Sequence, residues 1–105
     1  MDTINDKNKI TGFTDEELDL VNCGESEDMG KFPNINKLGH VKDSSGKVLS
    51  DITPLIMVIN SAGQDWRKIV QAMVAAGANL DMPIENYYGR NTTAREIANN
   101  YRNGL

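Results

Sequence analysis

The stretch from Thr53 to Asp81 constrains the fold most strongly, because it carries start and stop signals for two helices. Thr53 is a favourable N-cap residue, and Pro54 suits the first helical position, where its missing N–H is not needed. Gly77 follows the last apolar residues of the pattern, at the place where a helix end favours a positive φ. The stretch therefore predicts a helix, a turn and a second helix.

Apolar residues in this stretch repeat with the period of an α-helix. Leu55, Val58 and Ile59 form one stripe, and residues 62–64 interrupt it. Asp65 is predicted to cap the second helix, whose apolar positions recur at i, i+3, i+4, i+7 and i+8. These positions are Trp66, Ile69, Val70, Met73 and Val74. We expect Trp66 to pack between helices.

The same stretch resembles an ankyrin repeat, which opens with Thr-Pro-Leu, has a Gly-containing turn between two helices and ends near Gly-Ala-Asp-Val-Asn. Thr53, Pro54 and Leu55 match the opening, and residues 77–81 read Gly-Ala-Asn-Leu-Asp at the end. Ile56 stands where the family has His. The resemblance implies a mostly α fold, a short ankyrin-like stack of helix-turn-helix repeats joined by β-hairpin fingers.

The resemblance also implies a division of the chain. Residues 1–12 carry Asp, Asn and Lys without periodicity and are predicted to form a flexible N-terminal segment. Residues 13–105 are predicted to form a single ankyrin-like domain. Within it we expect a degenerate repeat or cap plus a hairpin at 13–50, the best-matching repeat plus a finger at 51–91, and a terminal helix at 92–105.

Local signals support the helices outside the central stretch. Thr14 and Glu17 have the spacing of a capping box, which predicts a helix at about residues 15–22, and Thr93 with Glu96 repeats the signal near the C-terminus.

Two hairpins are also predicted. Polar turn residues at 43–46 separate short apolar runs, which predicts a hairpin over residues 38–49. Residues 82–91 read as a second hairpin.

Composition narrows the class of partner. The chain has 105 residues, enough for one domain, and its 15 acidic against 11 basic residues give a net charge of −4. This balance argues against non-specific nucleic-acid binding and against an anionic membrane surface. No apolar run reaches the roughly 20 residues that span a bilayer, and no secretory signal is visible. With Cys23 as the single cysteine, we expect a cytoplasmic protein, in the producing cell or a host cell.

Residues with catalytic potential are few. Cys23 and the single histidine, His40, fall on different predicted elements, and no carboxylate converges with either by spacing. Glu25, Glu27 and Asp28 lack the order of a calcium loop, and residues 44–47, Ser-Ser-Gly-Lys, lack the full phosphate-loop pattern. We therefore expect no enzyme activity, no metal and no cofactor.

The ankyrin resemblance implies that hairpin tips and the outer face of the first helix contact a partner. The matching residues are Leu49, Ile52, Asn60, Ser61, Tyr87, Tyr88, Arg90, Asn100 and Tyr101. Tyr87 to Arg90 form the best single patch, since Tyr and Arg are enriched in binding hot spots. The alternative is that one tyrosine packs on the hairpin and Arg90 is only solvated. The expected function is a non-enzymatic protein–protein interaction module, an adaptor or inhibitor.

Three other functions stay open at this stage. One is a virus- or phage-encoded acidic inhibitor of a host nucleic-acid-processing or defence complex. Another is a structural homo-oligomer, and a third is a small enzyme that joins Cys23 or His40 to carboxylates. The inhibitor would act through an acidic face made of Asp15, Glu16, Glu17, Asp19, Glu25, Glu27 and Asp28.

Overall fold

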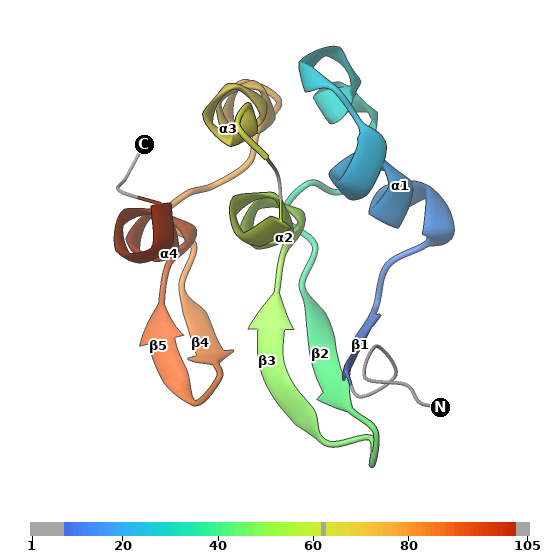
Figure 1. The fold of residues 1–105 in the computed structure, drawn as a ribbon, viewed down its shortest axis with the longest axis vertical. Helices are drawn as coiled ribbons and strands as arrows, with labels where there is room; N and C mark the ends of the chain where they lie inside the picture. Colours follow the sequence, from blue (N-terminus) through green and yellow to red (C-terminus); the bar gives the residue numbers. More distant parts are fainter. Residues whose placement is uncertain (1–7, 62, 103–105) are drawn as a thin grey trace.

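The computed structural model describes residues 8–61 and 63–102, and this part of the chain combines strands and helices (Figure 1). In chain order the elements are β1 (Asn8–Thr11), α1 (Asp15–Cys23), the 3₁₀ helix η2 (Ser26–Lys31), β2 (Gly39–Asp43), β3 (Val48–Ile52), α2 (Pro54–Ser61), α3 (Trp66–Ala75), β4 (Ile84–Tyr87), β5 (Arg90–Thr92) and α4 (Ala94–Arg102).

The strands form one antiparallel sheet in the order β1-β2-β3-β4-β5. Both predicted hairpins are present, as β2–β3 and β4–β5. The two hairpins join through the pair Ser50 and Tyr87. Strand β1 extends the sheet at the other side, although its residues were assigned to the predicted flexible segment. Residues 1–7 of that segment lie outside the described residues.

The predicted mostly α stack of ankyrin-like repeats is wrong, because the fold is mixed α/β with a five-stranded antiparallel sheet. The prediction treated each hairpin as a separate finger between helix pairs. In the structure, strand pairing continues from the first hairpin to the second and also recruits β1. These pairings join residues far apart in sequence, which a local pattern of helix signals does not reveal.

Capping confirms the predicted start of α1. The Thr14 hydroxyl accepts a hydrogen bond from the Glu17 N–H at 3.1 Å, and the Glu17 carboxylate accepts one from the Thr14 N–H at 2.7 Å. This is the reciprocal bonding of a capping box.

The other predicted helix signals, three in the central stretch and one at Thr93, are confirmed at three of four places. Thr53 accepts a hydrogen bond from the Ile56 N–H at 3.3 Å, and Glu96 N–H bonds the Thr93 hydroxyl at 3.2 Å. Gly77 has φ +111°, and the N–H of the next residue reaches the Met73 carbonyl at 2.9 Å, which closes the helix end. At the fourth place, Asp65 occupies the predicted N-cap position of α3, but its side chain accepts no capping hydrogen bond.

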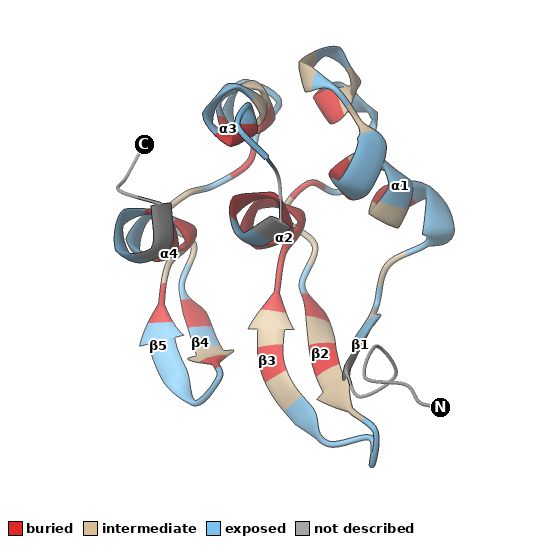
Figure 2. Ribbon diagram, viewed as in Figure 1, coloured by how far each residue is buried: buried red, intermediate tan, exposed pale blue. Residues whose placement is uncertain are grey.

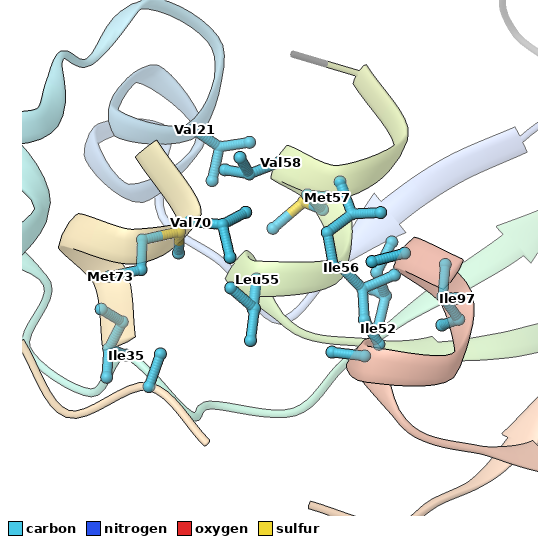
Figure 3. Packing of buried hydrophobic residues seen from close by; sticks show 14 of the residues in the cluster. Val21, Ile35, Ile52, Leu55, Ile56, Met57, Val58, Val70, Met73 and Ile97 are labelled. Carbon is cyan, nitrogen blue, oxygen red and sulfur yellow. The ribbon is translucent and has the colours of Figure 1, made fainter. Parts of the chain in front are cut away.

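Helix α2 is the centre of the hydrophobic core (Figures 2 and 3). Ile56, Val58 and Ile59 have no exposed surface, so the helix is enclosed on all sides rather than along one stripe. Helices α1, α3 and α4 all contact it. Trp66 is buried at the start of α3, as predicted. A helix that is apolar on all sides must be covered by other elements, and α1, α3 and α4 cover α2.

The helices gather at one end of the molecule, and the turns of the two hairpins project away from them (Figure 1). The sheet has buried residues where it meets the helices and exposed residues toward the turns (Figure 2). None of the helices in the described part is long and apolar enough to cross a membrane. The fold therefore displays the hairpin turns on a rigid helical base.

Candidate protein-interaction surface

The tip of the β4–β5 hairpin has an unusual backbone. Tyr87 and Arg90 are paired across the hairpin, and Tyr88 and Gly89 between them have φ values of +51° and +85°. Positive φ at both central residues is the pattern of a type I′ turn, which usually carries Asn-Gly. For an L-residue such as Tyr88, this conformation costs roughly 1–2 kcal/mol. The Gly89 N–H donates to the Asn86 side chain at 2.9 Å and closes the turn.

The two tyrosines of this tip have opposite roles. Tyr87 is buried, and its hydroxyl accepts a hydrogen bond from the Asn60 amide of α2 at 3.1 Å. Tyr88 is 54% exposed, and its ring meets the Tyr87 ring edge-to-face with centroids 5.0 Å apart. Tyr87 thus anchors the hairpin to α2 and supports the exposed ring of Tyr88.

A shallow hollow of about 330 Å³ lies between the two hairpins beside Tyr88. Strand β3 contributes Val48, which is 38% exposed, and the half-buried Leu49. Arg90 is exposed next to the tip, and its guanidinium forms no ion pair within residues 8–61 and 63–102. The hollow is lined by Lys47, Val48, Leu49, Asn86, Tyr88 and Gly89. We refer to these six residues and Arg90 as the tip surface.

The structure brings together only part of the predicted contact set. Leu49 and Tyr88 line the same hollow, and Arg90 directly follows the turn that holds Tyr88. Ile52 and Tyr87 are buried in the hydrophobic core, so neither side chain forms part of this surface.

The other predicted contact residues lie on the helices. Asn60 is exposed on α2 and holds the Tyr87 hydroxyl, and Asn100 is exposed on α4. Ser61 and Tyr101 belong to α2 and α4, but their side chains lie outside the described part of the structure. Asn60 and Asn100 do not line the hollow of the tip surface.

Sequence reasoning missed Val48, Lys47 and Asn86. Each belongs to a predicted hairpin, but their proximity depends on the pairing of β3 with β4. Alternation places Val48 on the same face of β3 as the buried Ser50 and Ile52, so the usable signal for its exposure was its position next to the turn.

His40 has a carboxylate partner that the sequence analysis did not find. Its Nδ1 lies 3.0 Å from the Asp51 carboxylate, because the two residues are cross-strand partners in β2 and β3. The expectation that no carboxylate converges on His40 is therefore wrong. Continuing the predicted hairpin register from its turn would have paired them.

Cys23 is exposed at the end of α1 and lines a different hollow, of about 370 Å³, with Glu16, Asp19, Asp28 and others. A reactive thiolate is favoured by neighbouring cations. Here the one cation, Lys31, donates to Asp28 at 2.8 Å, and His40 does not line the hollow. Within the described ranges, no group of three or more His, Cys, Asp or Glu residues is placed to hold a metal ion.

The predicted acidic face is smaller than its sequence suggests. Glu17 is buried and bonds Lys37 at 3.1 Å, while the Thr14 N–H, the largest influence, holds the pKa of Glu17 below its usual range. Asp28 bonds the Glu25 N–H, and this bond with the Lys31 ammonium lowers the pKa of Asp28. These two carboxylates stabilise local structure, which leaves Asp15, Glu16, Asp19, Glu25 and Glu27 as exposed acidic residues.

Comparison with known proteins adds no relative. No protein-family model, no curated protein and no solved structure matches the chain. Together with the five-stranded sheet, this overturns the assignment to the ankyrin repeat family. The residues that match the ankyrin pattern are general helix signals, a Thr-Pro start and a Gly stop. Such signals occur in any fold that needs a short helix.

Proposed function

We propose that the chain is a non-enzymatic protein-binding module, an adaptor or inhibitor, that contacts its partner through the tip surface. The observation that carries this proposal is the exposed Tyr88 ring, held at a positive φ beside an apolar hollow. Backbone strain of this kind persists where the surroundings enforce it, and it concentrates at binding sites. A bound partner would contact the exposed ring that this unfavourable backbone conformation presents.

The chemistry of the tip surface indicates the partner's chemistry. Tyr88, Val48 and Leu49 offer apolar contact area, and Arg90 offers a planar guanidinium that forms no ion pair among the described residues. A matching partner presents an apolar side chain to the hollow and a carboxylate to Arg90. Tyr and Arg at the centre of a contact are the types that carry most of the binding free energy.

Affinity capture tests the proposal with variants chosen from the turn geometry. Tyr88→Asn removes the ring but keeps a residue that tolerates positive φ. Val74→Asn is the matched control, because Val74 is a 39% exposed apolar residue of α3, away from the tip. A protein captured by the wild type is identified by mass spectrometry, purified and titrated against all three chains.

We expect the Tyr88→Asn variant to bind at least about tenfold more weakly, in line with a hot-spot loss above roughly 1.4 kcal/mol. The Val74→Asn variant should bind like the wild type. Equal affinity of all three chains would exclude the tip surface as the contact site. Capture of the chain itself alone would favour the homo-oligomer.

A second candidate is an inhibitor that contacts a basic, nucleic-acid-binding surface. The hollow beside α1 favours it, because Glu16, Asp19 and Asp28 line it together with the apolar Leu20. Such binding weakens steeply with salt, since exposed charges are screened. A Glu16→Gln/Asp19→Asn variant that retains full affinity at low salt would exclude this mode.

A further inference from the structure

Two lysines lie directly opposite each other where β1 pairs with β2. Lys9 and Lys42 are cross-strand partners, so their side chains leave the same face of the sheet. Like charges at such positions destabilise a sheet. In the described part of the chain, neither ammonium group forms a hydrogen bond or an ion pair. The chain thus maintains an unfavourable pair that no described carboxylate neutralises.

A hollow of about 480 Å³ lies against this pair. Strand β1 contributes Lys9 and Thr11, which point to the same face because side chains alternate along a strand. The turn between β2 and β3 contributes Ser44 and Gly46. This is the segment whose sequence resembles part of a phosphate loop. The hollow therefore combines two ammonium groups with hydroxyl groups at one place.

Asp43 is the one acidic residue that lines this hollow, and its carboxylate bonds the β2–β3 turn and not the two lysines. The Asp43 Oδ1 atom accepts hydrogen bonds from the Ser45 N–H at 2.9 Å, the Ser45 hydroxyl at 2.6 Å and the Lys47 N–H at 3.0 Å. Asp43 also follows Lys42 directly in β2, so its side chain leaves the opposite face of the strand. The two lysines consequently determine the charge on their side of the sheet.

We infer that Lys9 and Lys42 form a binding site for a phosphate group. A phosphate monoester carries a charge close to −2 and three strong acceptor oxygens, whereas a carboxylate carries a single charge. Two ammonium groups on one face of the sheet carry two positive charges, which match the charge of the phosphate dianion. Both groups can also donate hydrogen bonds to its oxygens. The Thr11 hydroxyl bonds the His40 carbonyl at 3.4 Å, a contact long enough to exchange for a phosphate oxygen. This site is separate from the tip surface, and the inference does not rest on the proposed function.

NMR titration of the full chain tests the inference. Inorganic phosphate replaces chloride at constant ionic strength, and phosphoserine and sulfate serve as further ligands. The wild type should show saturable shifts at the amides of residues 9–11 and 42–44. Lys9→Gln and Lys42→Gln should each weaken binding at least about tenfold, the usual loss for a charge-assisted contact. Lys68→Gln, at an exposed lysine of α3, is the matched control and should bind like the wild type.

The ligands also distinguish the source of the phosphate group. Tighter binding of phosphoserine than of inorganic phosphate assigns the site to a phosphorylated protein side chain, and equal binding assigns it to a small phosphate ion. Shifts that do not saturate, that chloride reproduces, or that Lys68→Gln weakens as much as Lys9→Gln would overturn the inference.

Thermal unfolding gives an independent readout. Lys9→Glu places a carboxylate opposite Lys42, so it should raise the Tm in phosphate-free buffer and abolish the further rise that phosphate causes in the wild type. A Lys9→Glu variant that melts below the wild type and still responds to phosphate would contradict the site.

Discussion

Helix α2 and the β4–β5 hairpin touch each other but use their residues in opposite ways. In α2, Ile56, Val58 and Ile59 have no exposed surface and the helix is enclosed by three others. At the hairpin tip, Tyr88 is more than half exposed and occupies an unfavourable region of backbone conformation. One region holds the fold together, and the other carries features that the fold itself does not require.

The difference shows where in the molecule a functional surface can be sought. Burial explains α2 completely, since each apolar side chain removed from water contributes to stability. Stability does not explain an exposed ring on a strained turn. The tip surface is therefore where we propose that a partner binds.

The largest expected effect comes from the helical region. Ile56→Ala should lower the free energy of unfolding by about 2–5 kcal/mol, because it leaves a cavity in a fully buried site. Urea unfolding followed by circular dichroism measures it. Val74→Ala, at an exposed site on α3, should change the value by no more than about 0.5 kcal/mol. Similar losses from both substitutions would show that α2 is not the centre of the core.

Acid sensitivity should also separate the helical end of the fold, here at α1, from the hairpin turns, here the β2–β3 turn. The pKa of Glu17 is lowered in the folded chain, first by the Thr14 N–H, so its contribution is present above the unfolded pKa of about 4.3 and is lost as pH falls through the folded pKa. Glu17→Gln should flatten the decline of unfolding free energy in this acid range.

Asp43 provides the comparison at the hairpin end. Its pKa is also lowered, chiefly by the Ser45 hydroxyl, but its hydrogen bonds lie in an exposed turn. Asp43→Asn should therefore flatten the pH profile less than Glu17→Gln. The reverse order would mean that the buried capping box contributes less than the turn.

The contact between the two regions should have an intermediate effect. Asn60→Ala removes the donor to the Tyr87 hydroxyl and should cost about 0.5–1.5 kcal/mol. Tyr87→Phe and the double variant complete a thermodynamic cycle that isolates the coupling. Strictly additive losses would show that this hydrogen bond does not link the hairpin to α2.

The smallest expected effect is at the tip itself. Tyr88→Gly should change the unfolding free energy by less than about 1 kcal/mol, because relief of the positive φ offsets the lost ring contact. Glu85→Gly, at an exposed position of the same hairpin in strand β4, should destabilise the chain by roughly 0.5–1 kcal/mol. A clear loss of stability from Tyr88→Gly would show that the tyrosine serves the fold.

Local parts of the fold were predictable from sequence. The Thr14 capping box, the Thr53 cap and the positive φ at Gly77 each depend on a few neighbouring residues. Both hairpins were also predictable, since polar turn residues separate their strands.

The continuous sheet was not predictable in the same way. It depends on β1 joining β2 and on the pair Ser50 and Tyr87, and both contacts span many residues. The same distinction between local and long-range signals applies to the candidate site. Tyr88 and Arg90 were found because hot-spot residue types stand next to a turn, whereas Val48 and the partner of His40 required the strand register. The ankyrin resemblance combined correct local signals into an incorrect global arrangement.

Hydrogen–deuterium exchange on the complex with a captured partner is the sharpest test of contact at the tip surface. Binding should slow exchange in residues 47–49 and 86–90, which include the tip surface, and leave residues 54–59 of α2 unchanged. Protection confined to residues 15–31, around the acidic hollow, would contradict it and place the contact at the opposite end of the molecule.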